Sequence, residues 1–198
     1  MNEFISRYGT AIGGAIVFIF FAVAADNFLN IGNLLTILRQ ISFLTILAIG
    51  FTYALIASEL DLSFAAVASL AGVVCGGLVH AGLAFPVAIA AALLVATAFG
   101  AANGLLVTRM KIPSLIATLA TASIATGLGF AFTNGVAWVG RWDRNFLWLG
   151  RGDILGIPVL VIWMVVIAAV SWFVVSQTRF GIWLVATGEA DVAARLAG

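Results

Sequence analysis

Charged residues are scarce in this chain of 198 residues. It has nine Lys and Arg, eight Asp and Glu, and a formal net charge of +1, so that 9% of its residues are charged. Soluble globular chains are about one quarter charged. The 64% hydrophobic content and the mean hydropathy of +1.20 exclude a soluble domain and predict that much of the surface faces lipid. The small net charge leaves no basic patch for phosphates, which argues against binding of nucleic acid.

Cysteine and histidine occur once each, and a phosphate-binding loop is missing. Cys75 lies in an apolar run, so it predicts a packing residue and neither a disulfide framework nor a thiolate metal site. His80 has no co-ligand near it in sequence and is interpreted as an interfacial residue. The chain contains no G-x-x-x-x-G-K-[ST] motif, so it cannot hydrolyse ATP by itself. We expect no cofactor, no metal and no enzymatic activity.

The few charges divide the chain into apolar intervals that are long enough to cross a bilayer, which takes about 20 residues. We predict an all-α membrane protein, a polytopic helical bundle of about six transmembrane helices that forms one domain over residues 1–198. The predicted spans are 8–25, 40–58, 62–80, 86–108, 114–135 and 156–177. The first apolar run ends in Ala-Val-Ala-Ala before Asp26, which also fits a signal peptide, but its length favours a retained span.

The Lys and Arg residues give only a weak preference for orientation. With the N-terminus inside, five of them fall in the cytoplasm and four fall outside. Three of the outer ones share a loop of about 137–158 with three Trp residues. That loop fits either aromatic rings at headgroup depth or a surface on which a soluble protein docks.

Small residues are dense in the predicted spans. Gly72 and Gly76, and likewise Gly100 and Gly104, have the G-x-x-x-G spacing that lets helix backbones approach closely. This spacing predicts close helix packing in a bundle.

Glu59 and Asp61 lie between the second and third predicted spans and have two readings. In the structural one they belong to a helix start: Ser58 and Asp61 have capping-box spacing, and Asp61 or Ser63 could equally cap the next helix. In the chemical one they form a carboxylate pair for ion coupling or acid/base work. Two acids spaced two apart at a helix start diverge, which favours the cap.

Asn103, Thr118 and Thr121 bring polar side chains into apolar helices. Lipid offers them no hydrogen-bond partner, so each is expected to face a neighbouring helix or a wet path, and both readings stay open. Pro113 cannot continue the preceding helix, which places Arg109 and Lys111 at the membrane surface.

The last stretch, residues 178–198, does not resemble a membrane span. Its four charges would each cost several kcal/mol in hydrocarbon. Gly181 and Gly188 punctuate it, and Asp191–Leu196 is predicted to be a short helix outside the bilayer. Because a short helix is not stable alone in water, it needs a surface to lie on.

Three blocks of this sequence resemble the permease subunits of the ribose-type branch of bacterial ABC importers. The segment Ser58–Ser63 is similar to G-[GE]-I-D-L-S, with Ser58 replacing a usual glycine, and residues 103–119 are similar to N-G-x-L-V-x-R-x-x-[VI]-P-x-x-I-x-T-L. The last stretch is similar to R-x-G-x-x-x-x-A-x-G-x-x-x-x-A-A-R-x-x-G. Departures from the usual pattern are Ala190, Ser114, Ala120 and Thr126.

The resemblance implies the inner-membrane permease subunit of a monosaccharide importer, with both termini and residues 179–198 in the cytoplasm. The residues it assigns to coupling with the ATPase are Gly181, Gly188, Asp191, Ala193, Ala194, Arg195 and Gly198. The implied partners are an ABC ATPase subunit, a periplasmic substrate-binding protein, a second permease subunit in a homodimer, and membrane lipid. Such permeases usually have around ten spans, so we expect this chain to be the N-terminal portion of a longer fold.

Two alternatives remain. One is an ABC permease for branched-chain amino acids or another small solute. The other is a secondary transporter in which Glu59 and Asp61 carry protons.

Overall fold

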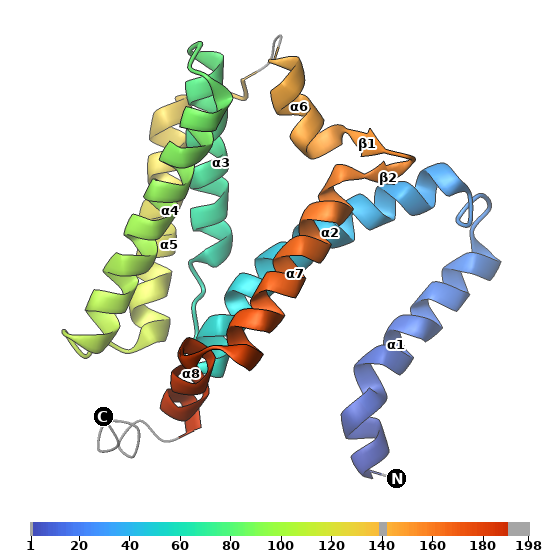
Figure 1. Cartoon of the computed structure of the whole chain (residues 1–198), viewed down its shortest axis with the longest axis horizontal. Coiled ribbons are helices and arrows are strands. Elements are labelled where there is room, and N and C mark those ends of the chain that lie inside the picture. Colours follow the sequence, from blue (N-terminus) through green and yellow to red (C-terminus); the bar gives the residue numbers. More distant parts are fainter. Residues whose placement is uncertain (1, 139–141, 190–198) are drawn as a thin grey trace. The chain divides into compact units, whose positions relative to one another are not determined.

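The computed structural model describes residues 2–138 and 142–189, with side chains described from residue 8 onward, and these residues are almost entirely helical (Figure 1). The helices are α1 (Asn2–Ala24), α2 (Ile31–Ile56), α3 (Phe64–His80), α4 (Phe85–Thr108), α5 (Ser114–Thr133), α6 (Arg144–Arg151), α7 (Val159–Gln177) and α8 (Arg179–Glu189). Two short strands, β1 (Asp153–Ile154) and β2 (Ile157–Pro158), precede α7. The chain divides into two compact units, Met1–Ile41 and Ser42–Gly198, with α2 passing from one to the other. The predicted all-α class is confirmed.

In the first unit, a turn with Phe28 packed against α1 connects α1 to α2. The ring of Phe28 lies 5.4 Å from that of Phe18 and 5.9 Å from that of Phe21, between centroids. Asn27 has φ 63, a left-handed conformation that asparagine tolerates better than most residues. Asn30 then accepts a hydrogen bond from the N–H of Gly32 at 2.9 Å, which satisfies a free donor at the start of α2.

The helix that contains the second predicted span begins earlier than residue 40, and the span bounds themselves stay a prediction. Helix α2 begins at Ile31 and includes Arg39 and Gln40 without a break. The charge of Arg39 was taken as a span boundary, but a long side chain in a helix can place its guanidinium away from the apolar region. The helix start is set by the cap at Asn30.

The core of the second unit lies where α3, α4 and α5 pack together. Its most buried members are Val67 and Leu70 on α3 and Ala125 on α5. The partly buried residues around them are Ala66, Val74, Val95, Ala96 and Phe99. Small residues at these contacts let the three helix backbones approach, as is common among helices in membranes.

The close approach predicted for the G-x-x-x-G pairs occurs elsewhere. A Cβ placed on Gly72, Gly100 or Gly104 would meet no described atom within 4 Å. A Cβ on Gly77 would lie only 2.5 Å from ring atoms of Phe132 and of Trp138. The glycine at position 77 thus lets aromatic rings pack against α3. At Gly72, Gly100 and Gly104 the predicted backbone contact is wrong within the described residues.

Those rings belong to an aromatic cluster at the C-terminal end of α3, made of His80, Phe132, Trp138, Trp142 and Phe146. His80 stacks on Trp138 with ring centroids 6.2 Å apart and an angle of 11° between planes, and lies 5.8 Å from Trp142. Phe132 meets Trp138 edge to face at 5.6 Å, and Trp142 lies 6.1 Å from Phe146. The cluster attaches the start of the loop after α5 to α3.

The region after this cluster is more ordered than the predicted loop. Asp143 caps α6 by accepting a hydrogen bond from the N–H of Phe146 at 2.9 Å. Strands β1 and β2 form a hairpin whose turn residues, Leu155 and Gly156, have φ 53 and φ 82. Positive φ at both central positions characterises the tightest hairpin turns. As a result α7 begins at Val159, three residues after the predicted start at 156.

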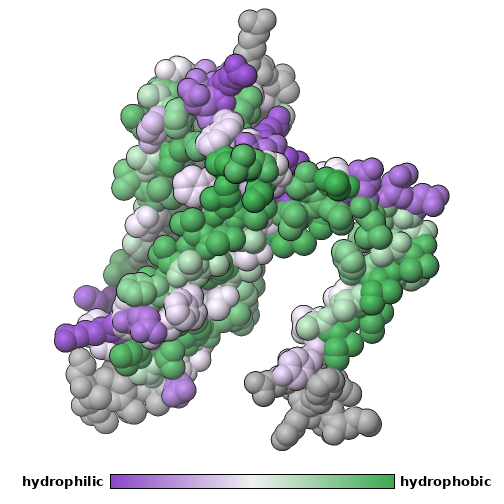
Figure 2. Space-filling view, turned by 45° about the vertical axis from the view of Figure 1, so that its right-hand side comes forward, coloured by the Kyte–Doolittle hydropathy of each residue, from purple (hydrophilic) through white to green (hydrophobic). Residues whose placement is uncertain are grey.

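Four described helices are long and apolar enough to cross a membrane, namely α2, α4, α5 and α7. The apolar part of α1, Tyr8–Ala24, and α3 are shorter, at the lower limit of about 17 residues for a span. The flanks of the larger unit are largely hydrophobic, and hydrophilic residues gather toward its ends (Figure 2). The chain is a polytopic membrane protein, and the count of six spans stays a prediction.

The last described helix also differs from the prediction. A helix was expected at Asp191–Leu196, which lies outside the described residues, whereas α8 spans Arg179–Glu189 and contains both Gly181 and Gly188. Thr178 is extended, and its hydroxyl oxygen accepts a hydrogen bond from the N–H of Gly181 at 3.4 Å, so it caps α8. A Cβ on Gly181 would collide with the carbonyl group of Val175. This glycine therefore permits the sharp turn between α7 and α8.

Candidate functional site

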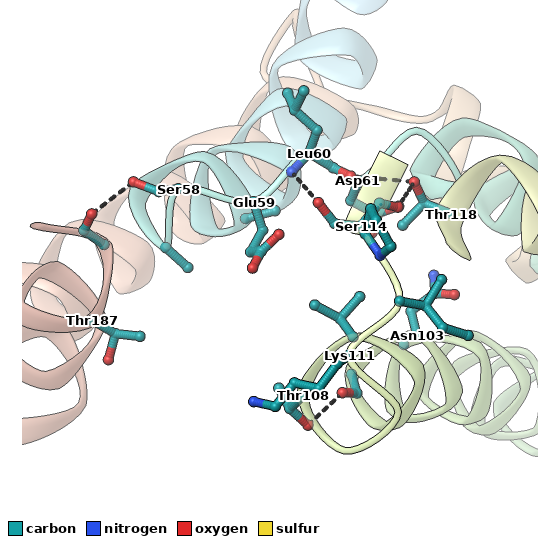
Figure 3. A pocket seen from close by; sticks show the side chains of 18 residues that line it. Ser58, Glu59, Leu60, Asp61, Asn103, Thr108, Lys111, Ser114, Thr118 and Thr187 are labelled. Atoms are coloured by element: carbon teal, nitrogen blue, oxygen red, sulfur yellow. Dashed lines mark hydrogen bonds between the residues drawn. The ribbon is translucent and has the colours of Figure 1, made fainter. Parts of the chain in front are cut away.

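A cavity of about 660 Å³, lined by both polar and apolar residues, lies in the larger unit, where α2, α4 and α8 end and where α3 and α5 begin (Figure 3). Small-molecule sites usually have about 300–1,000 Å³. Three segments form its walls: the connection from α2 to α3, the end of α4 with the turn into α5, and the end of α8. The lining residues are Ala54, Ala57, Ser58, Glu59, Leu60, Asp61, Gly100, Asn103, Gly104, Val107, Thr108, Lys111, Ile112, Pro113, Ser114, Thr118, Thr187 and Gly188.

The connection from α2 to α3 is attached to α8 through Ser58. The Ser58 hydroxyl donates a hydrogen bond to the carbonyl oxygen of Gly188 at 2.8 Å (Figure 3). The backbones approach so closely that a Cβ on Gly188 would collide with the carbonyl oxygen of Ile56. Ser58 has φ 59, a left-handed conformation that glycine adopts without strain. Ser58, which replaces the usual family glycine, therefore has a strained backbone conformation. In return its hydroxyl donates a hydrogen bond that glycine cannot make.

The same connection is held on its other side by hydroxyl groups of α5. Ser114 accepts a hydrogen bond from the N–H of Leu60 at 3.3 Å, and Thr118 accepts one from the N–H of Leu62 at 3.1 Å. The Thr118 hydroxyl lies 2.7 Å from the carbonyl oxygen of Ser114 and 3.2 Å from that of Leu60. Because a hydroxyl has one proton, the shorter contact is the better hydrogen bond. The extended backbone between two helices therefore obtains partners from α5.

Asp61 and Ser63, just before α3, form a partly buried chain of hydrogen bonds with Asn103 of α4. The Asp61 carboxylate accepts from the N–H of Ser63 at 2.8 Å and from its hydroxyl at 2.6 Å. The Ser63 hydroxyl oxygen accepts from the side-chain amide of Asn103 at 2.9 Å. Asn103 Oδ1 is buried and has no partner among the described residues. A buried carbonyl oxygen without a hydrogen-bond partner costs about 1–3 kcal/mol of stability. The unpaired Oδ1 of Asn103 therefore destabilises the fold beside the cavity.

These bonds decide between the predicted caps. Ser63 is the residue before α3, and its side chain makes no capping bond. The Ser58 hydroxyl bonds to Gly188, and Asp61 bonds the N–H of Ser63 just ahead of α3. The capping roles expected for Ser58 and Ser63 are therefore wrong, because both hydroxyls have better-placed partners elsewhere.

Asn103, Thr118 and Thr121 are all buried, with exposed fractions of 7%, 3% and 6%. Asn103 and Thr118 combine both predicted readings, because each bonds to another element and each lines the cavity. Thr121 does not line the cavity and lies 3.1 Å from the carbonyl oxygens of Ala117 and Thr118 in its own helix. A path-lining role for Thr121 has no support in its position.

Glu59 and Lys111 bring opposite charges to the cavity. Glu59 projects from the connection toward the cavity, and Lys111 with Thr108 lies on the opposite wall (Figure 3). Neither makes an ion pair with another residue in the described part of the chain. Lys111 has φ 58, in the turn that Pro113 imposes before α5. Glu59 and Asp61 diverge, as their spacing predicts, because Asp61 turns to Ser63.

The residues predicted to couple to an ATPase are only partly described. Gly181 lies in the first turn of α8, next to the end of α7, and Gly188 lines the cavity. Asp191, Ala193, Ala194, Arg195 and Gly198 lie outside the described residues. Thr187 and Gly188 share the cavity with Lys111, so the end of α8 lies at the same end of the larger unit as the turn after α4.

Sequence reasoning missed Thr108, Lys111 and Thr187 as neighbours in one cavity. The signal for the first two was available, since a threonine and a lysine just before a proline mark a helix end at an aqueous face. The contact of Ser58 with Gly188 left no signal, because 130 residues separate the two.

Comparison with known proteins agrees with this architecture. A family model described as "Branched-chain amino acid transport system / permease component" matches residues 33–198. The ribose import permease protein RbsC of Haemophilus influenzae is 29% identical over all of this chain and 62% of its own length, and that of Escherichia coli K12 is 34% identical over 88% of this chain and 55% of its own. The L-arabinose transport system permease protein AraH of Escherichia coli K12 is 33% identical over 97% of this chain and 58% of its own length.

The chain thus spans about three fifths of the length of the curated relatives that it matches. No solved structure matches it. The match of the family model over residues 33–198, with which the apolar helices agree, leads to one conclusion. The chain belongs to the family of branched-chain amino acid transport system permease components.

Proposed function

We propose that this chain forms part of the transmembrane path of a bacterial inner-membrane importer for a monosaccharide. The observation that carries the proposal is the similarity to ribose and L-arabinose permeases over 88–100% of the chain. The polar side chains that line the cavity among apolar helices support it, since a hydrated path through a membrane needs polar side chains that lipid does not reach.

The energy for import comes, in this proposal, from a separate ABC ATPase that docks on α8 and the residues after it. The position of α8 supports this, because it shares one end of the larger unit with Lys111, where positive charge favours the cytoplasmic side. Several apolar side chains of α8 are exposed, among them Phe180, Ile182 and Trp183. A periplasmic binding protein delivers the sugar, and a second permease subunit completes the path.

The link from Gly188 through Ser58 to the cavity wall supports a mechanism for coupling. A displacement of α8 is transmitted to the segment that carries Glu59, because the two backbones are in contact and hydrogen-bonded. That segment is bonded in turn to α5 through Ser114 and Thr118. Movement at an ATPase surface would thus reach the cavity wall without an intervening flexible loop.

Uptake into proteoliposomes tests this function. The protein that contains this chain is reconstituted with its ATPase and binding protein, and uptake of labelled D-ribose, L-arabinose and L-leucine is measured with ATP or with a proton gradient alone. The proposal expects saturable sugar uptake that requires ATP. Uptake driven by the proton gradient without ATP would instead support a secondary transporter that uses Glu59 and Asp61.

Co-purification of the ATPase tests the docking surface. Ala193→Arg is expected to abolish recovery of the ATPase with this chain, because a long charged side chain replaces a small contact residue. The matched control is Leu155→Arg, at a position that is 99% exposed in the hairpin before α7. Equal recovery of the ATPase with the two variants would contradict docking at residues 179–198.

The second candidate is an amino-acid permease. The description of the family names branched-chain amino acids, and Glu59 and Lys111 together match the ammonium and carboxylate of a zwitterion. Import of L-leucine in preference to both sugars would establish it.

A further inference from the structure

We infer that α6 and the hairpin of β1 and β2 form a membrane-contact surface at the start of α7 (Figure 1). In this surface the side chains of Arg144, Trp148 and Arg151 bind phospholipid headgroups, and the apolar tip of the hairpin enters the top of the acyl layer. Helix α7 separates the membrane-contact surface from α8 and the cavity, so the inference does not depend on the substrate or on the proposed function. It decides between headgroup contact and protein docking for the loop of about 137–158.

Hydrogen bonds fix the depth of α6 and of the hairpin relative to α7. The N–H of Gly152, the residue after α6, donates to the carbonyl oxygen of Trp148 at 2.8 Å, and the N–H of Val159 donates to that of Gly152 at 2.9 Å. The first residue of α7 is thus bonded to the residue that ends α6. The 19 residues of α7 include no charged residue and are about 28 Å long at 1.5 Å per residue, close to the ~30 Å of a hydrocarbon core. The end of α6 and the base of the hairpin therefore lie at one boundary of the hydrocarbon.

Helix α6 directs its apolar side toward the protein and a basic, aromatic side outward. It packs against α7. Its half-buried apolar side chains are Phe146, Leu147 and Leu149. Arg144, Trp148 and Arg151 follow one another at intervals of four and three residues, which places them on one face of the helix. Both arginines are exposed and Trp148 is 47% exposed, so this face is available to a ligand.

The outward face of α6 matches the headgroup of a phospholipid. A guanidinium group binds phosphate through two parallel N–H donors, and the indole of tryptophan favours the membrane interface because its ring is apolar and its N–H is polar. Asp143 and Asp153 balance Arg144 and Arg151, so the segment 143–153 has no net charge. Because it carries charges of both signs, this segment complements a zwitterionic headgroup.

The tip of the hairpin has a leucine where a turn in water favours a polar residue. Leu155 has φ 53, a conformation that is costly for residues other than glycine, asparagine and aspartate. Asn-Gly is the favoured pair in such a turn, and this chain has Leu-Gly. Leu155 is 99% exposed, and Ile154 and Ile157 beside it are 42% and 51% exposed. In water the tip would combine backbone strain with exposed apolar area, whereas acyl chains remove that area from water.

Continuity with α7 favours lipid over a soluble protein as the occupant of this surface. Helix α7 is apolar along its whole length and exposes Trp163 near its start. Because the base of the hairpin is bonded to the first residue of α7, the exposed apolar side chains of the hairpin adjoin a surface that lipid covers. A soluble protein docked on the tip would have to displace headgroups to reach it.

Fluorescence quenching by nitroxide-labelled lipids tests the inference. The protein that contains this chain is placed in nanodiscs of phosphatidylcholine, with its native cysteines, Cys75 among them, replaced by alanine. A small fluorophore is attached to one introduced cysteine at a time: Leu155→Cys at the tip, Trp148→Cys on α6, or Val166→Cys inside α7. The nitroxide is carried on the lipid headgroup, at the top of the acyl chain or in its middle, and iodide is the quencher in water.

The label at Leu155→Cys is expected to be quenched most by the nitroxide at the top of the acyl chain. The reason is that interfacial apolar residues lie about 5–10 Å into the boundary between headgroups and acyl chains. The label at Trp148→Cys should be quenched most by the headgroup nitroxide. Val166→Cys is the deep control, about 10 Å along α7 from its first residue, and the nitroxide in the middle of the chain should quench it most.

Arg144→Glu combined with Arg151→Glu tests the role of the headgroup. Carboxylates repel phosphates, so the label at Leu155→Cys should shift toward water, with more quenching by iodide and less by the acyl nitroxides. The control is Arg109→Glu, an exposed position at the other end of the larger unit, which should leave quenching at Leu155→Cys unchanged. Unchanged quenching in the double variant would overturn the assignment of the two arginines.

Two patterns of quenching at Leu155→Cys would overturn the inference as a whole. Strong quenching by iodide with none by any lipid would place the tip in water, and its loss on addition of the periplasmic binding protein would assign the tip to a soluble partner. Absence of quenching from both sides would show that another part of the protein covers the tip. Each result is independent of transport, so this inference and the proposed function can fail separately.

Discussion

At the C-terminal end of α3, Trp138 and Trp142 pack around His80, while at the N-terminal end Ser63 joins Asp61 to Asn103 through hydrogen bonds. The first packs the segment after α5 against α3, the second bonds the residues just before α3 to Asn103 of α4, and the two use different interactions. Ring packing is weakly directional, so rings can rotate or slide and keep most of their contact. A buried hydrogen-bond chain has no such freedom, because each donor needs its acceptor in place.

The size of the individual interactions does not separate the two ends. An aromatic pair contributes about 0.5–1.5 kcal/mol beyond its buried area, and a hydrogen bond contributes about 0.5–1.5 kcal/mol net. What separates them is what each close contact touches. Gly77 faces the rings of Phe132 and Trp138, whereas Gly188 faces the backbone of Ile56. A ring can turn away from an added methyl group, and a carbonyl group in a helix cannot.

Gly188→Ala is therefore expected to destabilise the chain more than Gly77→Ala. Overpacking usually costs about 1–3 kcal/mol, and we expect the upper part of that range for Gly188→Ala and the lower part for Gly77→Ala. Thermal unfolding of both variants in the same detergent measures the difference. The control is Gly127→Ala, where a Cβ meets no described atom within 4 Å, and where alanine should be neutral or stabilising by up to about 1 kcal/mol.

A larger loss for Gly77→Ala than for Gly188→Ala would contradict this comparison. It would mean that the aromatic cluster is the rigid end and that the backbone at Ile56 yields.

Asn103→Asp tests the hydrogen-bond chain itself. Aspartate has the same shape but no amide donor, so Ser63 would lie between two carboxylates, one of them Asp61. We expect a loss of about 1–3 kcal/mol in the free energy of unfolding, measured by thermal or denaturant unfolding. The exposed Asn33, whose side-chain amide donates to the carbonyl oxygen of Phe28, provides the control: Asn33→Asp should change stability by less than about 0.5 kcal/mol. Equal losses of stability in the two variants would show that the hydrogen bonds among Asp61, Ser63 and Asn103 contribute no more than an exposed hydrogen bond.

Much of the fold could be predicted because the membrane imposes a simple rule on composition. Apolar intervals between charges predicted the helical class and most helix ends to within a few residues, as at Thr108 and Ser114. The rule failed at Arg39, where a charge lies inside a helix, and at α6, where the amphipathic segment after Asp143 forms a helix that is too short for a span. In both places a capping residue marks the start of the helix in the sequence, Asn30 for α2 and Asp143 for α6.

The candidate site was predictable only in its parts. The sequence identified Glu59, Asp61 and Asn103 as polar residues in an apolar chain, and Asp61 and Asn103 are joined through Ser63. It could not pair Ser58 with Gly188, since contacts between distant segments depend on how helices pack and not on local pattern. The same holds for the cavity, whose walls come from three separate stretches.

The smallest of the expected effects concerns Ser58, where two substitutions separate backbone strain from the hydrogen bond. Ser58→Ala removes the bond to Gly188 and keeps the left-handed backbone at φ 59, so it should lower stability by about 1 kcal/mol. Ser58→Gly also removes the bond, but it relieves the strain of a side chain in that conformation by a similar amount, so its stability should stay close to that of the native chain. Hydrogen exchange at the end of α8 supplies the second measurement, and both variants should exchange faster there because both lose the bond. If Ser58→Gly exchanged as slowly as the native chain, the close backbone contact alone would hold α8 against α2, and the hydroxyl of Ser58 would have no part in transmitting its movement.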